Sequence, residues 1–344
     1  MPLDPAVAHG TLPNGLTYFI RTHDEPRERA ELRLVVNAGS ILEDDDQRGL
    51  AHFVEHMAFN GTENFEKQEL VDYLESIGIR FGADLNAYTS FDETVYMLTV
   101  PTDDPELVRT GVQVLSEWAA KITFDPEEID KERGVVIEEW RLGRGAGARI
   151  FDKQAPVVFH DSRYAERLII GKKETLESAP PETITRFYRD WYRPDLMAIV
   201  AVGDFDAATV EELIRTNFGS IPAAVDPRPR TAYTVPPHSE TLYSIVTDPE
   251  ATMTRVRVMQ KMPPRELVTE AEYRRAIVER LGDAMLNQRL EERSREADPP
   301  YIAAGSGVGN AVREMGTYNL VAIVDGGGLD RGLEAILTEA ERVA

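Results

Sequence analysis

The chain has 344 residues, of which 42% are hydrophobic and 28% charged, and its formal net charge is -22 at pH 7. This length is enough for two domains that each bury a core. The negative charge argues against a nucleic-acid partner, which needs a basic surface, and no apolar stretch reaches the roughly 18 residues of a membrane span. Cysteine is absent, which excludes disulfides, thiolate ligands and cysteine nucleophiles.

The first two thirds of the chain alternate between strand and helix patterns. Strands are predicted where β-branched and aromatic residues alternate, and helices where apolar residues recur every three or four positions. The predicted strands cover residues 17–20, 31–36, 93–100 and 196–204, the last being a continuous apolar run that is typical of a central strand. The predicted helices cover residues 67–77, 107–122, 126–140 and 207–218, with mostly helical structure over 147–192.

A proline-rich stretch separates this part from the rest, with five prolines in the sixteen residues 222–237. Such a composition is typical of a linker. Beyond it, strands are predicted over 241–246, 254–259, 301–308 and 318–324, and helices over 270–295 and 329–344. The last pattern has no glycine cap or trailing proline, so we expect the chain to be a fragment of a longer protein.

The sequence His52-Phe53-Val54-Glu55-His56 is the strongest chemical signal. On a helix its polar members fall at i, i+3 and i+4, so two imidazoles and a carboxylate share one face. The flanking residues are apolar, and a buried polar edge needs a partner. A divalent metal, most often zinc, is one such partner. The alternative is that neighbouring polar groups satisfy this edge.

A catalytic zinc site needs a third protein ligand, and the helix predicted after Pro126 is a source of one. Glu132 and Glu139 are seven residues apart and share a face of that helix, whereas Glu138 points about 100° away. For Glu132, pairing with an arginine is the alternative. The acidic run at residues 43–46 precedes the motif helix, and we expect it to be a solvated helix cap rather than a set of ligands.

Three segments in the same order resemble those of the pitrilysin-type inverted-zincin metallopeptidases, which include insulin-degrading enzyme and the mitochondrial processing peptidase. The segments are residues 49–62, 86–96 and 132–141. Within that family the chain looks most like the long bacterial periplasmic members. The resemblance is clearest over residues 11–220 and continues more weakly to the C-terminus.

The resemblance implies roles for individual residues. His52, His56 and Glu139 would bind one zinc ion, and Glu55 would be the general base that deprotonates the zinc-bound water. Glu132 would orient a ligand histidine. Asn86 and Ala87 match the segment that, in the family, pairs with the substrate backbone as an added strand.

The resemblance also implies an α+β fold of two successive domains, each a largely antiparallel sheet packed with helices. The expected catalytic domain covers 1–221, the linker 222–238, and a second, non-catalytic and incomplete domain 239–344. The implied function is that of a zinc-dependent endopeptidase acting on peptides or unfolded segments. The alternatives are a non-catalytic peptide-binding or scaffold subunit and a processing peptidase with a narrow substrate.

Family members consist of two similar halves, so the expected partners are a peptide substrate and either the C-terminal half of the same longer chain or a homologous subunit. The resemblance to periplasmic members favours the periplasm. The N-terminus carries no signal-peptide pattern, so for an exported protein the signal would already have been removed. If Met1 is the native start, the cytoplasm is the expected location.

Overall fold

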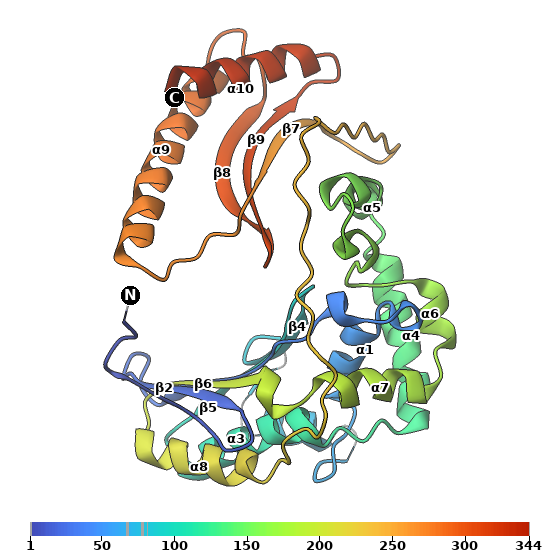
Figure 1. Cartoon of the computed structure of the whole chain (residues 1–344), viewed down its shortest axis with the longest axis vertical. Helices are drawn as coiled ribbons and strands as arrows, with labels where there is room; N and C mark the ends of the chain where they lie inside the picture. The colour runs from blue at the N-terminus through green and yellow to red at the C-terminus, as the bar shows by residue number, and fades with distance from the viewer. Residues whose placement is uncertain (1, 67–68, 77–78, 81, 344) are drawn as a thin grey trace. The chain divides into compact units, whose positions relative to one another are not determined.

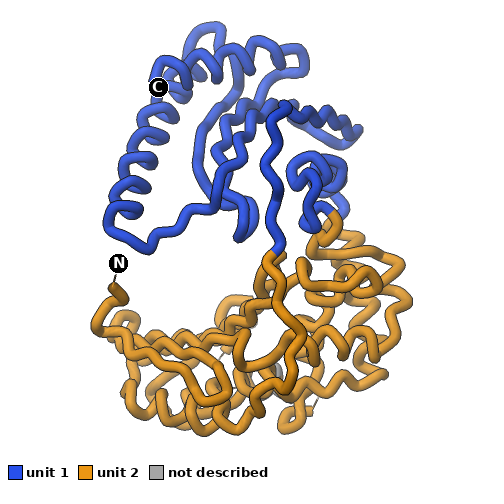
Figure 2. Tube along the Cα trace, viewed as in Figure 1, with its two compact units in different colours: residues 1, 144–165, 233–344 blue, residues 2–143, 166–232 orange. Residues whose placement is uncertain are grey.

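The computed structural model describes residues 2–66, 69–76, 79–80 and 82–343. Two compact units are distinguished (Figure 2): one contains residues 2–143 and 166–232, and the other contains residues 144–165 and 233–344. The helical segment 144–165 therefore groups with the C-terminal part of the chain. The domain boundaries at 221 and 239 stay a prediction.

The first unit is built on a six-stranded sheet with the order β1-β2-β6-β3-β5-β4. Only β2 and β6 run parallel, and the other neighbours are antiparallel. The predicted central strand is confirmed as β6, which pairs with β2 on one side and β3 on the other. The strands are β1 (Val7–Thr11), β2 (Thr17–Thr22), β3 (Arg29–Val36), β4 (Leu85–Thr89), β5 (Thr94–Pro101) and β6 (Met197–Gly203).

Helices pack against this sheet (Figure 1). They are α1 (Leu50–Met57), α2 (Glu69–Ser76), α3 (Pro105–Ala120), α4 (Pro126–Leu142), α6 (Lys173–Ser178), α7 (Pro181–Trp191) and α8 (Ala207–Gly219). Helix α3 contacts β3 and β5, and α8 contacts β2, so these two helices cover the sheet. Helix α1 contacts β4, α4 and α7. The HisxxGluHis helix therefore lies beside the edge strand and beside the second predicted ligand helix.

The second unit has a three-stranded antiparallel sheet with the order β7-β9-β8. Its elements are α5 (Ala146–Val158), β7 (Thr254–Met262), α9 (Glu270–Ser294), β8 (Ala303–Val312), β9 (Met315–Val324) and α10 (Leu329–Val343). The order of these strands repeats that of β3, β5 and β4 in the first unit. In both sets the last strand in the sequence lies between the other two, and all neighbours are antiparallel. The predicted α+β class with largely antiparallel sheets is confirmed.

The strand predicted over residues 241–246 is wrong, because this segment has no regular secondary structure. Its alternating pattern is not buried: Tyr243 and Ile245 are 80% and 94% exposed. A strand is stable only when a neighbouring strand takes up its hydrogen bonds, and the alternation of side chains cannot reveal whether one is present. Among the described residues, no helix is long and apolar enough to cross a membrane.

The core of the second unit lies between its sheet and helices α9 and α10. Leu290 of α9 is fully buried in it, whereas Leu281 of the same helix is 61% exposed. We expect Leu290→Ala to lower the free energy of unfolding by about 2–5 kcal/mol through the cavity it leaves. Leu281→Ala should change it by less than about 0.5 kcal/mol. Urea denaturation measures both, and equal effects would contradict this packing.

Candidate metal centre

A tight backbone junction and a buried carboxylate fix the start of α1. Gly49 precedes the helix with φ 101°, a left-handed conformation that favours glycine. A Cβ at Gly49 would also meet Gly171 Cα at 3.0 Å. Glu43 Oε1 accepts hydrogen bonds from the backbone N–H groups of Gly49 (3.0 Å) and Ala51 (2.8 Å). The negative charge thus lies at the positive end of the helix dipole.

The expectation of a solvated acidic cap is therefore wrong for Glu43, which is completely buried. Asp45 and Asp46 are exposed, as expected. The three aspartates also make ion pairs: Asp44 with Arg228, Asp45 with Arg167 and Asp46 with Arg186. A run of acids in a sequence does not show where the arginines will come from. Here they lie more than 100 residues downstream.

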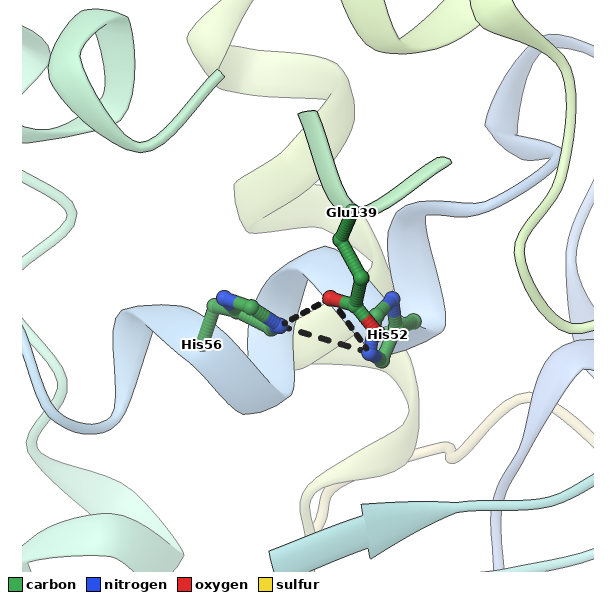
Figure 3. A group of neighbouring side chains, drawn as sticks. All are labelled: His52, His56 and Glu139. Carbon is green, nitrogen blue, oxygen red and sulfur yellow. Dashed lines mark hydrogen bonds and ion pairs between the residues drawn. The ribbon is translucent and has the colours of Figure 1, made fainter. Parts of the chain in front are cut away.

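Helices α1 and α4 bring three predicted ligands together (Figure 3). His52 Nε2 lies 3.3 Å from His56 Nε2. Glu139 Oε2 lies 3.3 Å from His56 Nε2 and 3.8 Å from His52 Nε2. Glu132 and Glu139 were expected to share a face of this helix because they are seven residues apart. The structure agrees, since both side chains contact the histidines of α1 from the same face of α4.

The spacing of these donor atoms fits a zinc ion. Zinc bonds of about 2.0–2.1 Å at tetrahedral angles place two ligand atoms about 3.3–3.4 Å apart. The measured separations of 3.3, 3.3 and 3.8 Å are close to that value. Two histidines and one glutamate also form a known catalytic donor set, in which the fourth position is left for water or substrate.

Glu132 contacts one of these histidines. Its Oε1 lies 2.7 Å from His56 Nδ1, and its Oε2 accepts a 2.8 Å hydrogen bond from Asn60 Nδ2. A carboxylate can only accept, so His56 Nδ1 carries a proton, and in the neutral imidazole the Nε2 lone pair then faces the centre. Both oxygens of Glu132 thus contact the segment after His52 instead of the arginine considered above.

The two histidines have opposite electrostatic tendencies. Burial, together with the nearby His56, lowers the pKa of His52 to about 4. Burial also lowers the pKa of His56, but hydrogen bonds to Glu132 and Glu139 outweigh it and raise that pKa to about 9. The hydrogen bond from His56 lowers the pKa of Glu139. One positive charge is therefore favoured among these residues, and a metal cation could supply it in place of a proton.

Glu55 lies on the same helix as the histidines but does not join the ligand group. Its side chain is buried, at 7% exposure, and burial raises its pKa although a hydrogen bond from Thr89 opposes that effect. Thr89 Oγ1 donates to Glu55 Oε2 at 2.5 Å. A buried carboxylate whose pKa is raised in this way can act as a general base.

The predicted substrate-contacting residues lie on β4, which is an edge strand because, among the described residues, it pairs only with β5. Asn86 is exposed and Ala87 is partly buried. In the register, Asn86 lies opposite Met97 and Ala87 opposite Tyr96. The outer edge of β4 is the place where a further strand could add to the sheet.

Two residues beside the site were not assigned a role from the sequence: Asn60, which contacts Glu132, and Thr89, which contacts Glu55. For Thr89 the alternation of side chains over residues 85–89 could have given a signal. Because side chains alternate between faces, Leu85, Ala87 and Thr89 share one face of β4, and Leu85 on that face is buried. For Asn60, sequence spacing gave no comparable signal.

Comparisons with known proteins agree with the geometry. The family described as "Insulinase (Peptidase family M16)" matches residues 18–142, and "Peptidase M16 inactive domain" matches residues 178–344. A protein from Arabidopsis thaliana named "Zinc protease PQQL-like" is 43% identical over 86% of this chain and 31% of its own length. "Probable zinc protease PqqL" from Haemophilus influenzae is 35% identical over 87% of this chain and 32% of its own length.

A solved structure is also similar: "the first half of the periplasmic protease PqqL from Escherichia coli", with a TM-score of 0.88 and 31% identity over 98% of this chain and 72% of that chain. The chain spans about a third of the length of the curated relatives it matches. Both curated relatives are named as zinc proteases, which agrees with the predicted zinc cofactor. In this chain the group of His52, His56 and Glu139 could bind the ion. The chain belongs to the M16 family of zinc metallopeptidases, as the resemblance predicted.

Proposed function

We propose that this chain carries the zinc centre of an endopeptidase that cleaves peptides or unfolded polypeptide segments. The observation that carries the proposal is the convergence of His52, His56 and Glu139 within 4.8 Å, with the buried carboxylate of Glu55 on the same helix as the two histidines. The M16 membership and the relatives named as zinc proteases support it.

In this proposal His52, His56 and Glu139 hold zinc, which when bound lowers the pKa of water to about 7 and polarises a carbonyl oxygen. Glu55 takes a proton from the attacking water and returns it to the leaving amine. Its raised pKa suits both steps, because such a carboxylate accepts the proton more readily near neutral pH. Glu132 holds His56 in the tautomer that presents Nε2.

The substrate is proposed to bind as an extended strand along the free edge of β4, at Asn86 and Ala87. Backbone hydrogen bonds hold a peptide added to a sheet in this way, so binding needs an unfolded segment but little sequence specificity. The contact between α1 and β4 supports this placement, because it keeps the edge strand next to the helix that carries Glu55.

The relatives are about three times as long as the matched region. We therefore propose that activity depends on further protein, supplied by the rest of a longer chain or by a homologous subunit. The periplasm is the proposed location, since the solved relative is described as a periplasmic protease. A non-catalytic scaffold role is less well supported, because it would not require Glu55 to be retained beside three metal ligands.

The direct test is hydrolysis of an unstructured, fluorescence-quenched peptide by the full-length protein. We expect cleavage at internal bonds, loss of cleavage after a chelator has removed the metal, and recovery when one equivalent of zinc is added. Mass spectrometry of the products distinguishes endopeptidase action from removal of terminal residues. Cleavage that persists in the metal-free protein would contradict the proposal.

Loss of Glu132 should weaken zinc binding without abolishing it. Removing a carboxylate that orients a ligand histidine typically lowers metal affinity about 10- to 100-fold, and we expect Glu132→Ala to fall in that range. Glu138→Ala is the matched control, since Glu138 lies on the same helix but pairs with Arg141. Competition with a zinc-binding dye measures both variants. Equal affinities in the two would show that Glu132 does not orient His56.

A further inference from the structure

The hydroxyl group of Thr89 contacts the proposed general base directly. We propose that Thr89 is a positioning residue, which holds Glu55 in the orientation needed for proton transfer. This inference rests on the proposed function, because it takes Glu55 to be the base. Thr89 is the last residue of β4, and its Oγ1 lies 2.5 Å from Glu55 Oε2.

The available protons assign the direction of this hydrogen bond. Thr89 has one hydroxyl proton and two oxygen neighbours, Glu55 Oε2 at 2.5 Å and Thr94 Oγ1 at 3.4 Å. An ionised carboxylate can only accept, so the short contact requires Thr89 to donate. Thr94 directs its own proton elsewhere, to the carbonyl oxygen of Ala38 at 3.0 Å. The Thr89 proton is therefore committed to Glu55.

The backbone holds Thr89 in place for this contact. In the β4–β5 register Thr89 lies opposite Thr94, which is fully buried and bonded to Ala38. Threonine is also β-branched, which restricts its χ1 angle. The donor thus comes from a side chain with little rotational freedom, on a strand that is anchored to the interior of the sheet.

Two buried, uncharged tyrosines lie near Thr89 and Glu55. The hydroxyl groups of Tyr96 and Tyr192 are 2.8 Å apart. Burial, with a smaller contribution from the charge of Glu55, raises the pKa of both tyrosines, so they remain uncharged at neutral pH. Among these neighbours Thr89 is the group that the structure shows bonded to the Glu55 carboxylate. Fixing Oε2 leaves Oε1 as the oxygen that accepts the proton from water.

The position of Thr89 also connects the base with the substrate. Asn86 and Ala87, where the peptide is proposed to add, lie three and two residues before Thr89 on the same five-residue strand. A peptide that pairs with β4 is therefore aligned on the strand that orients Glu55. One rigid segment sets the positions of both the scissile bond and the base.

The test is Thr89→Val, which keeps the shape and β-branching of the side chain but removes the donor. In the zinc-loaded full-length protein we expect kcat for a quenched peptide to fall about 10- to 100-fold, the range for a hydrogen bond to a charged group. KM should stay within about twofold, and zinc content should remain at one equivalent. Thr89→Ser restores the hydroxyl and should recover kcat to within about threefold of the native value.

Thr99→Val is the matched control, because Thr99 is also partly buried in the same sheet but lies five residues further along β5 than Thr94. It should leave kcat unchanged. Four results would each overturn the positioning role. In Thr89→Val they are a native kcat, a change confined to KM, and loss of zinc; the fourth is an equal loss of kcat in Thr89→Val and Thr89→Ser. Glu55→Gln distinguishes a failure of the proposed function from a failure of the inference about Thr89. If Glu55→Gln cleaves peptide, the proposed function fails. If Glu55→Gln is inactive while Thr89→Val is fully active, only the inference about Thr89 fails.

Discussion

Glu55→Gln is expected to lower kcat for peptide cleavage about 10²- to 10⁴-fold, the usual contribution of a general base. The amide has nearly the same shape as the carboxylate but cannot take a proton from water. Zinc content should not change, because Glu55 is not among the three residues whose donor atoms converge. Steady-state kinetics of the zinc-loaded full-length protein, together with metal analysis, measures both effects.

Glu128→Gln is the matched control for this substitution. Glu128 is also 7% exposed, but it lies near the start of α4 and pairs with Lys131. We expect its kcat to stay within about twofold of the native value. If Glu55→Gln retained native cleavage, the proton would have to be taken by another group, and the account of the mechanism would be wrong.

The second large effect is expected from the ligands themselves. His56→Ala removes a donor atom that lies 3.3 Å from both His52 Nε2 and Glu139 Oε2, and it leaves Glu132 without its imidazole partner. Zinc affinity should therefore fall by more than the 10- to 100-fold expected when only an orienting partner is lost. Cleavage should disappear with the metal.

His160→Ala is the control for this loss. His160 lies in the other unit and its side chain is 41% exposed, so its removal should affect neither zinc binding nor cleavage. Isothermal titration with zinc compares the two variants, and circular dichroism checks that both are folded. Native zinc affinity in His56→Ala would exclude His56 as a ligand.

The site could be predicted from the sequence where its geometry is local. His52, Glu55 and His56 share a face because helical periodicity requires it, and the structure places them on α1 as expected. Glu139 was one of two helix-face glutamates until the family resemblance distinguished it. In the structure the two glutamates contact different atoms. Glu139 lies near the Nε2 atoms of both histidines, whereas Glu132, two helical turns earlier on α4, contacts His56 Nδ1.

The parts that could not be predicted depend on contacts between distant segments. The hydrogen bond between Thr89 and Glu55 exists because β4 packs beside α1, and spacing along the chain does not encode that. The burial of Glu43 depends on its folding back onto the start of α1. The error at residues 241–246 has the same origin, since local alternation was present but a pairing strand was not.

The central claim is that this chain holds one zinc ion through His52, His56 and Glu139. The measurement that tests it most directly is the metal content of the purified chain at neutral pH, in a sample never exposed to a chelator. The account predicts about one equivalent of zinc in the native chain and little in His56→Ala. Less than about a tenth of an equivalent in the native chain would contradict it.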